Sequence, residues 1–292
     1  MRRKIIAAIL AVGMSISCFA GAAFASENEE ASNAADLMAE YEITSEDVEF
    51  VANIFKQINE GNDPGLTETD YYDMELKLAK LGADMGNGEL ALWVGEIYQG
   101  GHVDGVSENE AIEIAFDWWE RAVELGQPRG WTNIGLIYAH RTVPGGGDNF
   151  GDIELDQDTA LEYLKKADDA GDTKAPRYIA FTYEDAEDYE NALAYYLKAA
   201  ELEDTTANYY VGKYYYEGLG TDVDYEAALE YLTAAASSEK NVPGVSDARY
   251  LLGVMYENGD GVDADLDTAV EWYEGAAEFG SEDAETALAR LS

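Results

Sequence analysis

The chain, 292 residues long, is poor in cysteine and in positive charge. Its single cysteine, Cys18, excludes an internal disulfide and any zinc site built from cysteines. Only 18 lysines and arginines stand against 60 aspartates and glutamates, which leaves a net charge of −42. This imbalance argues against nucleic acid as a partner and against charge-driven docking on an anionic membrane surface. Because 47% of the residues are hydrophobic, the chain has material for a core and is not a disordered acidic tail.

Sequence signatures of catalysis are also missing. There is no Gly-x-Ser-x-Gly segment, and no pattern joins a nucleophile to its base. The glycines at 145–147 are not followed by the Lys or Ser/Thr of a phosphate-binding loop, and they predict a loose insertion instead. His102 and His140 lie 38 residues apart in separate loops and are interpreted as exposed polar residues rather than metal ligands. We therefore expect no catalytic activity, no cofactor and no metal.

Calcium is the ion that so acidic a chain could attract. The runs 152–158 and 263–267 have the alternating carboxylates of a calcium loop, but Gln157 and Thr268 stand where that loop needs glycine. Asp156 is already explained as a helix cap. Weak condensation of divalent ions is favoured over a specific calcium site.

The N-terminus has the pattern of a secretory signal. Positive residues at 2–4 precede an uncharged run at 5–24, and Ala23-Phe24-Ala25 has the small-x-small form of a signal-peptidase site. Cleavage after Ala25 is predicted, which places the mature chain outside the cytoplasm, secreted or in a bacterial cell envelope, with no membrane attachment. The alternatives are an uncleaved anchor, because 20 residues just suffice to span a bilayer, and a lipid on Cys18. Ser15 stands where a lipoprotein signal would have an aliphatic residue.

After the signal, the composition divides the chain into three parts. Residues 26–44 are acidic and weakly apolar, which predicts a flexible spacer. Ser45 begins a segment with helical spacing of apolar residues, and 45–87 is predicted to be an N-terminal helical cap or partial repeat. Residues 88–292 repeat with a period near 40 and are predicted to form a repeat array with a C-terminal capping helix.

The repeat is defined by markers at helical spacing. A small residue lies at the centre of the first helix of each unit, at Gly95, Gly135, Ala180, Gly212 and Gly253. The steps between these residues are 40, 45, 32 and 41, so the loops vary while the helices keep their frame. The last unit is the fullest, with Ala248, Leu252-Gly253, Tyr256, Gly259-x-Gly261, Asp265, Ala269, Trp272-Tyr273 and Ala276-Ala277.

Each marker has a physical reason. A small residue at the helix centre allows two helices to approach closely, and the Gly-x-Gly after it indicates a turn with positive φ. An aspartate four residues before the alanine of the second helix is placed as an N-cap, and it recurs at Asp156, Asp188, Asp224 and Asp265. No unit can bury its apolar face alone, so the units must stack.

These residues resemble the Sel-one-like repeat family, the relatives of tetratricopeptide repeats, over roughly 88–291. The resemblance implies an all-α, right-handed superhelical solenoid of antiparallel helix pairs, with the first helix of each pair lining the concave side. It also implies a binding role rather than catalysis. Some exported members carry a cysteine pair in each repeat and have been linked to penicillin binding; without cysteines in the mature chain, that activity is not implied here. Ala180 and the insertion at 141–155 depart from the family pattern.

The resemblance also implies which positions face the groove, namely −3, +1 and +4 from the central small residue. We call these the groove slots. In the third to fifth units they hold an aromatic and basic set that no marker requires, and such residues are typical of binding surfaces. The predicted ligand-binding residues are Arg177, Phe181, Tyr209, Lys213, Tyr216 and Tyr250. The alternative is that the tyrosines pack between repeats.

The function predicted from these features is an exported, non-catalytic scaffold that binds a protein or peptide in its groove. The alternative is a cell-envelope enzyme or binding protein for peptidoglycan or glycans. Trp118 and Trp119 are the residues that could stack on a sugar, but the repeat frame favours core positions for them.

Overall fold

The computed structural model describes residues 76–292 with the exception of 78, 102 and 241. The predicted signal peptide, the spacer, the helix beginning at Ser45 and His102 lie outside the described residues. The chain divides into two compact units, Met1–Tyr163 and Leu164–Ser292, which are described separately. Residues 79–84 are helical and bury Leu81 and Ala83, so the described end of the predicted N-terminal cap adds apolar side chains to the first unit.

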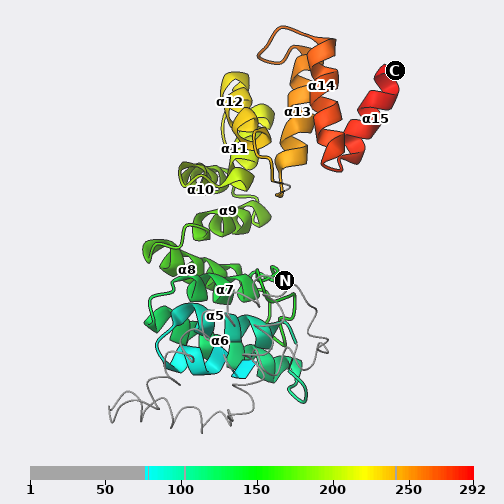
Figure 1. Ribbon diagram of the computed structural model, residues 1–292. Coiled ribbons are helices and arrows are strands. Elements are labelled where there is room, and N and C mark those ends of the chain that lie inside the picture. The colour runs from blue at the N-terminus through cyan, green and yellow to red at the C-terminus, as the bar shows by residue number, and fades with distance from the viewer. Residues whose placement is uncertain (1–75, 78, 102, 241) are drawn as a thin grey trace, which may run out of the picture. The chain divides into compact units, whose positions relative to one another are not determined.

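The described residues from Gly88 onward form five successive helix pairs and one terminal helix (Figure 1). The pairs are α5 (Gly88–Gln99) with α6 (Glu108–Glu124), α7 (Arg129–Tyr138) with α8 (Gln157–Asp169), α9 (Ala175–Asp185) with α10 (Tyr189–Glu201), α11 (Thr205–Glu217) with α12 (Tyr225–Ala236), and α13 (Val245–Asn258) with α14 (Leu266–Glu278). Helix α15 (Glu282–Leu291) follows the last pair and packs on α14. The expected all-α fold of paired helices is confirmed, and each central small residue lies in the first helix of its pair.

The small residues sit beneath large side chains of the second helix. A Cβ added to Gly95 would collide with the ring of Trp119, which is fully buried. In the last pair, a Cβ on Gly253 would lie 2.5 Å from Cε1 of Tyr273. The requirement for a small residue is therefore confirmed at these positions, and its cause is a large side chain of the second helix: an aromatic ring at Gly95 and Gly253, and Leu232 at Gly212. Trp119 belongs to the core, where its indole Nε1 donates to the carbonyl of Leu92 at 3.3 Å.

The second helices begin where the aspartates predict. The side chain of Asp224 accepts a hydrogen bond from the backbone N–H of Ala227 at 3.0 Å, and Asp265 accepts from Thr268 at 3.2 Å. Asp156 and Asp188 cap α8 and α10 in the same way. Each cap satisfies an N–H that has no partner within its helix, and this stabilises the helix by about 1 kcal/mol.

The Gly-x-Gly turns combine positive φ with a close approach to the preceding repeat. Gly218 and Gly220 have φ values of 72° and 65°, as predicted. A Cβ on Gly220 would also collide with the carbonyl oxygen of Tyr189, the first residue of α10. Gly261 approaches Tyr225 at the start of α12 in the same manner. The second glycine of the turn is thus required for packing between repeats.

Candidate functional site: the groove slots

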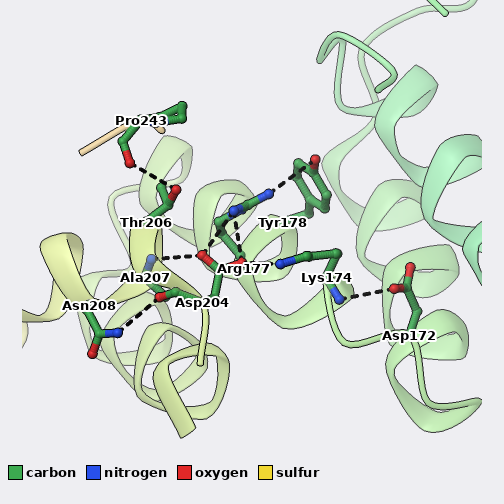
Figure 2. A network of polar contacts seen from close by, with 9 residues as sticks. All are labelled: Asp172, Lys174, Arg177, Tyr178, Asp204, Thr206, Ala207, Asn208 and Pro243. Atoms are coloured by element: carbon green, nitrogen blue, oxygen red, sulfur yellow. Dashed lines mark hydrogen bonds and ion pairs between the residues drawn. The ribbon is translucent and has the colours of Figure 1, made fainter. Parts of the chain in front are cut away.

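The groove slot at Arg177 is part of a buried ion-pair network (Figure 2). Nη1 of Arg177 lies 3.0 and 2.9 Å from the two carboxylate oxygens of Asp204, and Nζ of Lys174 lies 3.1 Å from the same carboxylate. The Asp204 side chain is 2% exposed, and it also accepts from the backbone N–H of Ala207 as the N-cap of α11. Arg177 therefore ties α9 of the third pair to the start of α11, and its charge is balanced within the chain.

The charges in this network explain the ionisation of Asp204. Burial alone would raise the pKa of this carboxyl, but the positive charge of Arg177 and the hydrogen bonds from Ala207 and Lys174 lower the pKa below its usual value. Asp204 is consequently charged at neutral pH. Arg177 is one of the predicted ligand-binding residues, and the carboxylate that it contacts comes from Asp204 of the same chain.

Phe181 and Tyr209 contact other aromatic rings of the second unit. The Phe181 ring packs edge-on against Tyr196 and Tyr210, with centroid distances of 5.8 and 5.2 Å. Tyr209 packs edge-on against Tyr210 at 5.0 Å and lies so close to Gly244 that a Cβ there would be 2.8 Å from Cβ of Tyr209. These contacts support the packing alternative for both residues, and a binding role for them stays a prediction.

Tyr216 and Lys213 differ in how they are held. The Tyr216 hydroxyl donates to Asp260 of the next repeat at 3.0 Å, and burial together with this carboxylate raises the pKa of Tyr216 to about 12. Lys213 is half-buried and has neither a hydrogen bond nor an ion pair with any part of the chain that the structure describes. Among the predicted basic slot residues, Lys213 is therefore the one whose charge is available to a partner.

The slots of the last pair line an open pocket. Tyr250, Val254 and Glu257, at −3, +1 and +4 from Gly253, surround a volume of about 310 Å³. The remaining wall comes from Tyr273 of α14 and from α15, which contributes Asp283, Thr286, Ala287 and Arg290. Tyr250 thus lines this pocket, and its ring centroid is 5.7 Å from that of Tyr273; a binding role for it stays a prediction.

Glu257 is the centre of the polar contacts in this pocket. Its Oε2 accepts from the Tyr273 hydroxyl at 2.8 Å and from Nη2 of Arg290 at 2.7 Å. These two hydrogen bonds, that from Arg290 first, lower the pKa of Glu257, so its carboxylate is charged at neutral pH. The Arg290 side chain is 57% exposed, so this ion pair lies at the mouth of the pocket.

In the first unit, the equivalent slots hold a segment of the chain itself. Gln99, at +4 from Gly95, is fully buried, and its Nε2 donates to the carbonyls of Gly147 at 3.0 Å and Asn149 at 2.8 Å. Its Oε1 accepts from the backbone N–H of Gly147. A Cβ on Gly145 would collide with Glu96, the +1 slot, so the glycines are needed for the close approach. The insertion that was predicted to be loose is instead hydrogen-bonded across α5, and this expectation was wrong.

His140 has a local structural role at the start of the same insertion. Its ring stacks on Phe150 with a centroid distance of 4.9 Å, and its Nε2 lies 2.8 Å from the carbonyl oxygen of Ile153. Within the described ranges, no group of three His, Cys, Asp or Glu side chains could hold a metal ion. The described part of the chain also contains no helix with the length and apolar character needed to cross a membrane.

The repeat frame matches a known family model. The model of the Sel1 repeat matches residues 89–127, 146–172, 185–204, 205–239 and 246–281, which together make up more than half of the chain. The chain belongs to the Sel1 repeat family. The matches to its second and third repeats are short: they cover α8 and α10 but no residue of α7 and only the last residue of α9. The insertion after α7 and Ala180 in α9 are the departures from the pattern in these repeats.

Solved structures support the same fold. A Sel1 repeat protein from Oxalobacter formigenes is 25% identical, with a TM-score of 0.57 over 77% of this chain and 85% of that chain. The protective antigen c5321 of uropathogenic Escherichia coli, which displays an SLR fold, is 21% identical with a TM-score of 0.60. The alignment with c5321 covers 90% of this Sel1 repeat chain and 54% of the antigen. No curated protein sequence matches the chain.

The pocket residues of α15 were not found from the sequence. Asp283 and Arg290 lie in a capping helix that has no repeat markers, so nothing in the Sel1 repeat pattern predicts which slots they face. The sequence did contain a signal for Glu257, because a glutamate at slot +4 occurs together with a tyrosine in the second helix of the same repeat. The same pair occurs in the third repeat, where the Tyr196 hydroxyl donates to Glu184 at 2.6 Å.

Proposed function

We propose that this chain is an exported, non-catalytic scaffold that binds an extended polypeptide segment in the groove of its repeats. Sel1 repeats are in general scaffolds for protein–protein interaction. The observation that carries the proposal is the contact between Gln99 and the insertion. There, a +4 slot already binds main-chain groups of an irregular loop through a side-chain amide.

In the last repeat, the same slots line an open pocket whose facing wall is α15. Its pocket combines two tyrosine rings with charged groups, and aromatic and charged side chains in a concave site are typical of binding surfaces. Lys213, in the preceding repeat, adds an uncompensated charge to the groove of the same unit. Together these features support a polypeptide partner for the Leu164–Ser292 unit.

Capture of a partner by the immobilised mature chain tests the proposal. Envelope extract is passed over the protein, the retained polypeptide is identified, and its affinity is measured with the purified pair. Lys213→Glu is expected to weaken binding at least tenfold. The same change at Lys240, an exposed residue beyond α12, is the matched control and should leave the affinity unchanged.

Two results would contradict the scaffold proposal. Turnover of wall fragments, or saturable binding of them that excludes the polypeptide, would favour an envelope enzyme or glycan-binding protein. Equal affinity of the parent and Lys213→Glu for the captured partner would remove this part of the groove from the binding site. Melting temperatures of both variants confirm that each remains folded.

Export is part of the same proposal and has its own test. The motifs at residues 2–4 and 23–25 support cleavage after Ala25, so N-terminal analysis of the native protein should find Ser26 first. A membrane-bound chain that begins at Met1, or a lipid on Cys18, would contradict it.

A further inference from the structure

We propose that the pocket between α13 and α15 binds the ammonium group of a lysine side chain presented by an extended basic segment of the partner. This inference rests on the proposed function, since it assigns a chemistry to one part of the same groove. The pocket is formed by Tyr250, Val254, Glu257, Tyr273, Asp283 and Arg290. It brings two carboxylates and the half-buried ring of Tyr250 to one concave site.

The charge around the pocket favours a cation. Residues 245–292 contain twelve acidic side chains and only two basic ones, Arg249 and Arg290. Arg249 is committed to the fold: it donates to the carbonyls of Ala236, Gly275 and Ser238, and its guanidinium lies 4.0 Å from the centroid of the Phe279 ring. A partner carboxylate would therefore meet a strongly negative surface, whereas a lysine would be attracted to it.

The walls of the pocket match the needs of an ammonium group. An ammonium donates up to three hydrogen bonds and is stabilised by carboxylates and by the faces of aromatic rings. Glu257 and Asp283 supply the carboxylates, and the half-buried Tyr250 ring lines the same space. Tyr273 is almost fully buried, and its hydroxyl holds Glu257 in place. Val254 provides an apolar surface for the methylene groups of a lysine stem.

Arg290 indicates how the site is occupied when no partner is bound. Its guanidinium pairs with Glu257 at 2.7 Å, so the chain places its own cation on the carboxylate that the ligand would use. The Arg290 side chain is 57% exposed, and exposed ion pairs contribute little to stability, so an incoming lysine can displace it. Arg290 is thus a competitor of the ligand.

The test uses the full mature chain and a labelled ten-residue peptide of alternating lysine and serine. Binding is followed by fluorescence anisotropy at moderate salt. The same peptide with Nε-acetyl-lysine, and one with glutamate in place of lysine, are expected to bind at least tenfold more weakly. Because any acidic chain attracts a basic peptide, the decisive result is the difference between matched variants.

Three variants distinguish binding in the pocket from general attraction of a basic peptide to the acidic surface. Asp283→Asn is expected to weaken binding about tenfold, and Glu285→Gln, which removes one charge from an exposed position of the same helix outside the pocket, should change it less than twofold. Arg290→Ala is expected to strengthen binding several-fold, because it removes the competing cation. A lysine site predicts this gain, whereas a site for a partner carboxylate predicts a loss.

The outcomes are distinct from those of the scaffold test. Equal effects of Asp283→Asn and Glu285→Gln, weaker binding by Arg290→Ala, or preference for the glutamate peptide would each overturn the lysine site. If the captured partner binds with normal affinity to Asp283→Asn and Arg290→Ala, the lysine site fails while the scaffold function stands. Failure of the scaffold function would appear instead as retention of no polypeptide at all by the parent chain.

Discussion

The first and last repeats share one helix frame but differ in what their groove slots contact. In the first repeat, Glu96 and Gln99 contact the chain's own insertion, and Gln99 is fully buried. In the last repeat, Val254 and Glu257 line a pocket of about 310 Å³. The slots can therefore bind main-chain groups, and the segment that follows each repeat decides whether the chain itself provides them.

The segment that follows each repeat separates the two regions. The connection between α7 and α8 spans residues 139–156, which is long enough to lie across α5 and to cap α8 at its end. The connection between α13 and α14 is confined to 259–265, a Gly-x-Gly turn that leads directly into the Asp265 cap. The insertion that fills the slots of α5 comes from the following repeat, whereas the last pair is followed by α15, which forms the facing wall of its pocket.

In the repeats between the first and the last, the slot residue Arg177 contacts Asp204 of the same chain. Asp204→Asn tests whether this contact stabilises the fold, and it has the largest expected effect. The variant leaves the guanidinium of Arg177, 18% exposed, without its carboxylate, and should lose about 3 kcal/mol of unfolding free energy at neutral pH. Urea denaturation of variant and parent measures the loss. A loss below about 1 kcal/mol would show that the ion pair contributes little to stability, and Arg177 would again be a candidate for binding a partner.

The Arg177–Asp204 ion pair also makes the free energy of unfolding depend on pH in a defined way. Because the folded-state pKa of Asp204 is lowered, its contribution to stability is complete above the ordinary aspartate pKa of about 3.9 and disappears as the pH falls through the folded-state pKa. The stability difference between parent and Asp204→Asn should therefore shrink below about pH 4. A difference that stays constant into that range would assign the effect to shape rather than to charge.

Alanine at the central glycines tests whether the two repeats share one frame. Gly95→Ala and Gly253→Ala should each lose about 2–3 kcal/mol, because the new methyl group would collide with Trp119 or Tyr273. Gly275 of α14 is the control, since a Cβ there would meet only Cδ of Arg249 at 3.7 Å. Gly275→Ala should be neutral or stabilise the fold by up to about 1 kcal/mol. A large loss at only one of the central glycines would show that the first and last repeats do not share one helix frame.

Gln99→Ala tests whether the first groove is filled by specific contacts. The change removes the donors to Gly147 and Asn149 and should cost about 2 kcal/mol, since buried main-chain groups lose their partners. Limited proteolysis should then cut the insertion at 143–151 faster than in the parent. Unchanged cleavage would show that the glycines hold the insertion without Gln99.

Salt should act on both regions alike and is expected to have the smallest effect. Residues 88–292 carry 44 acidic and 12 basic side chains, and this net charge of −32 is spread over repeats that contact only their neighbours, so moderate sodium chloride should raise the melting temperature by a few degrees through screening. Calcium at matched ionic strength should add nothing further. A rise with calcium alone would restore the interpretation of the acidic runs as a specific site.

The local features of this chain could be predicted because each depends on residues close together in sequence. Asp224 and Asp265 cap helices that begin at the next residue, and Gly218 and Gly220 adopt positive φ in a turn of their own. The all-α fold, the repeat frame and the family follow from such markers, since the same short pattern recurs along the chain. The core position of Trp119 follows as well, because helical spacing places it on the buried face of α6.

The tertiary structure alone decided what the groove slots contact. Arg177 pairs with Asp204, which is 27 residues away, and Gln99 hydrogen-bonds to Gly147, which is 48 residues away. Glu257 pairs with Arg290, which is 33 residues away. None of these partners occupies a marker position, because each depends on how the next repeat, an insertion or the capping helix packs against the slot. A repeat pattern specifies the contacts that every unit must make to stack; contacts that differ between units, which determine what the groove can bind, arise only when the particular neighbours are in place.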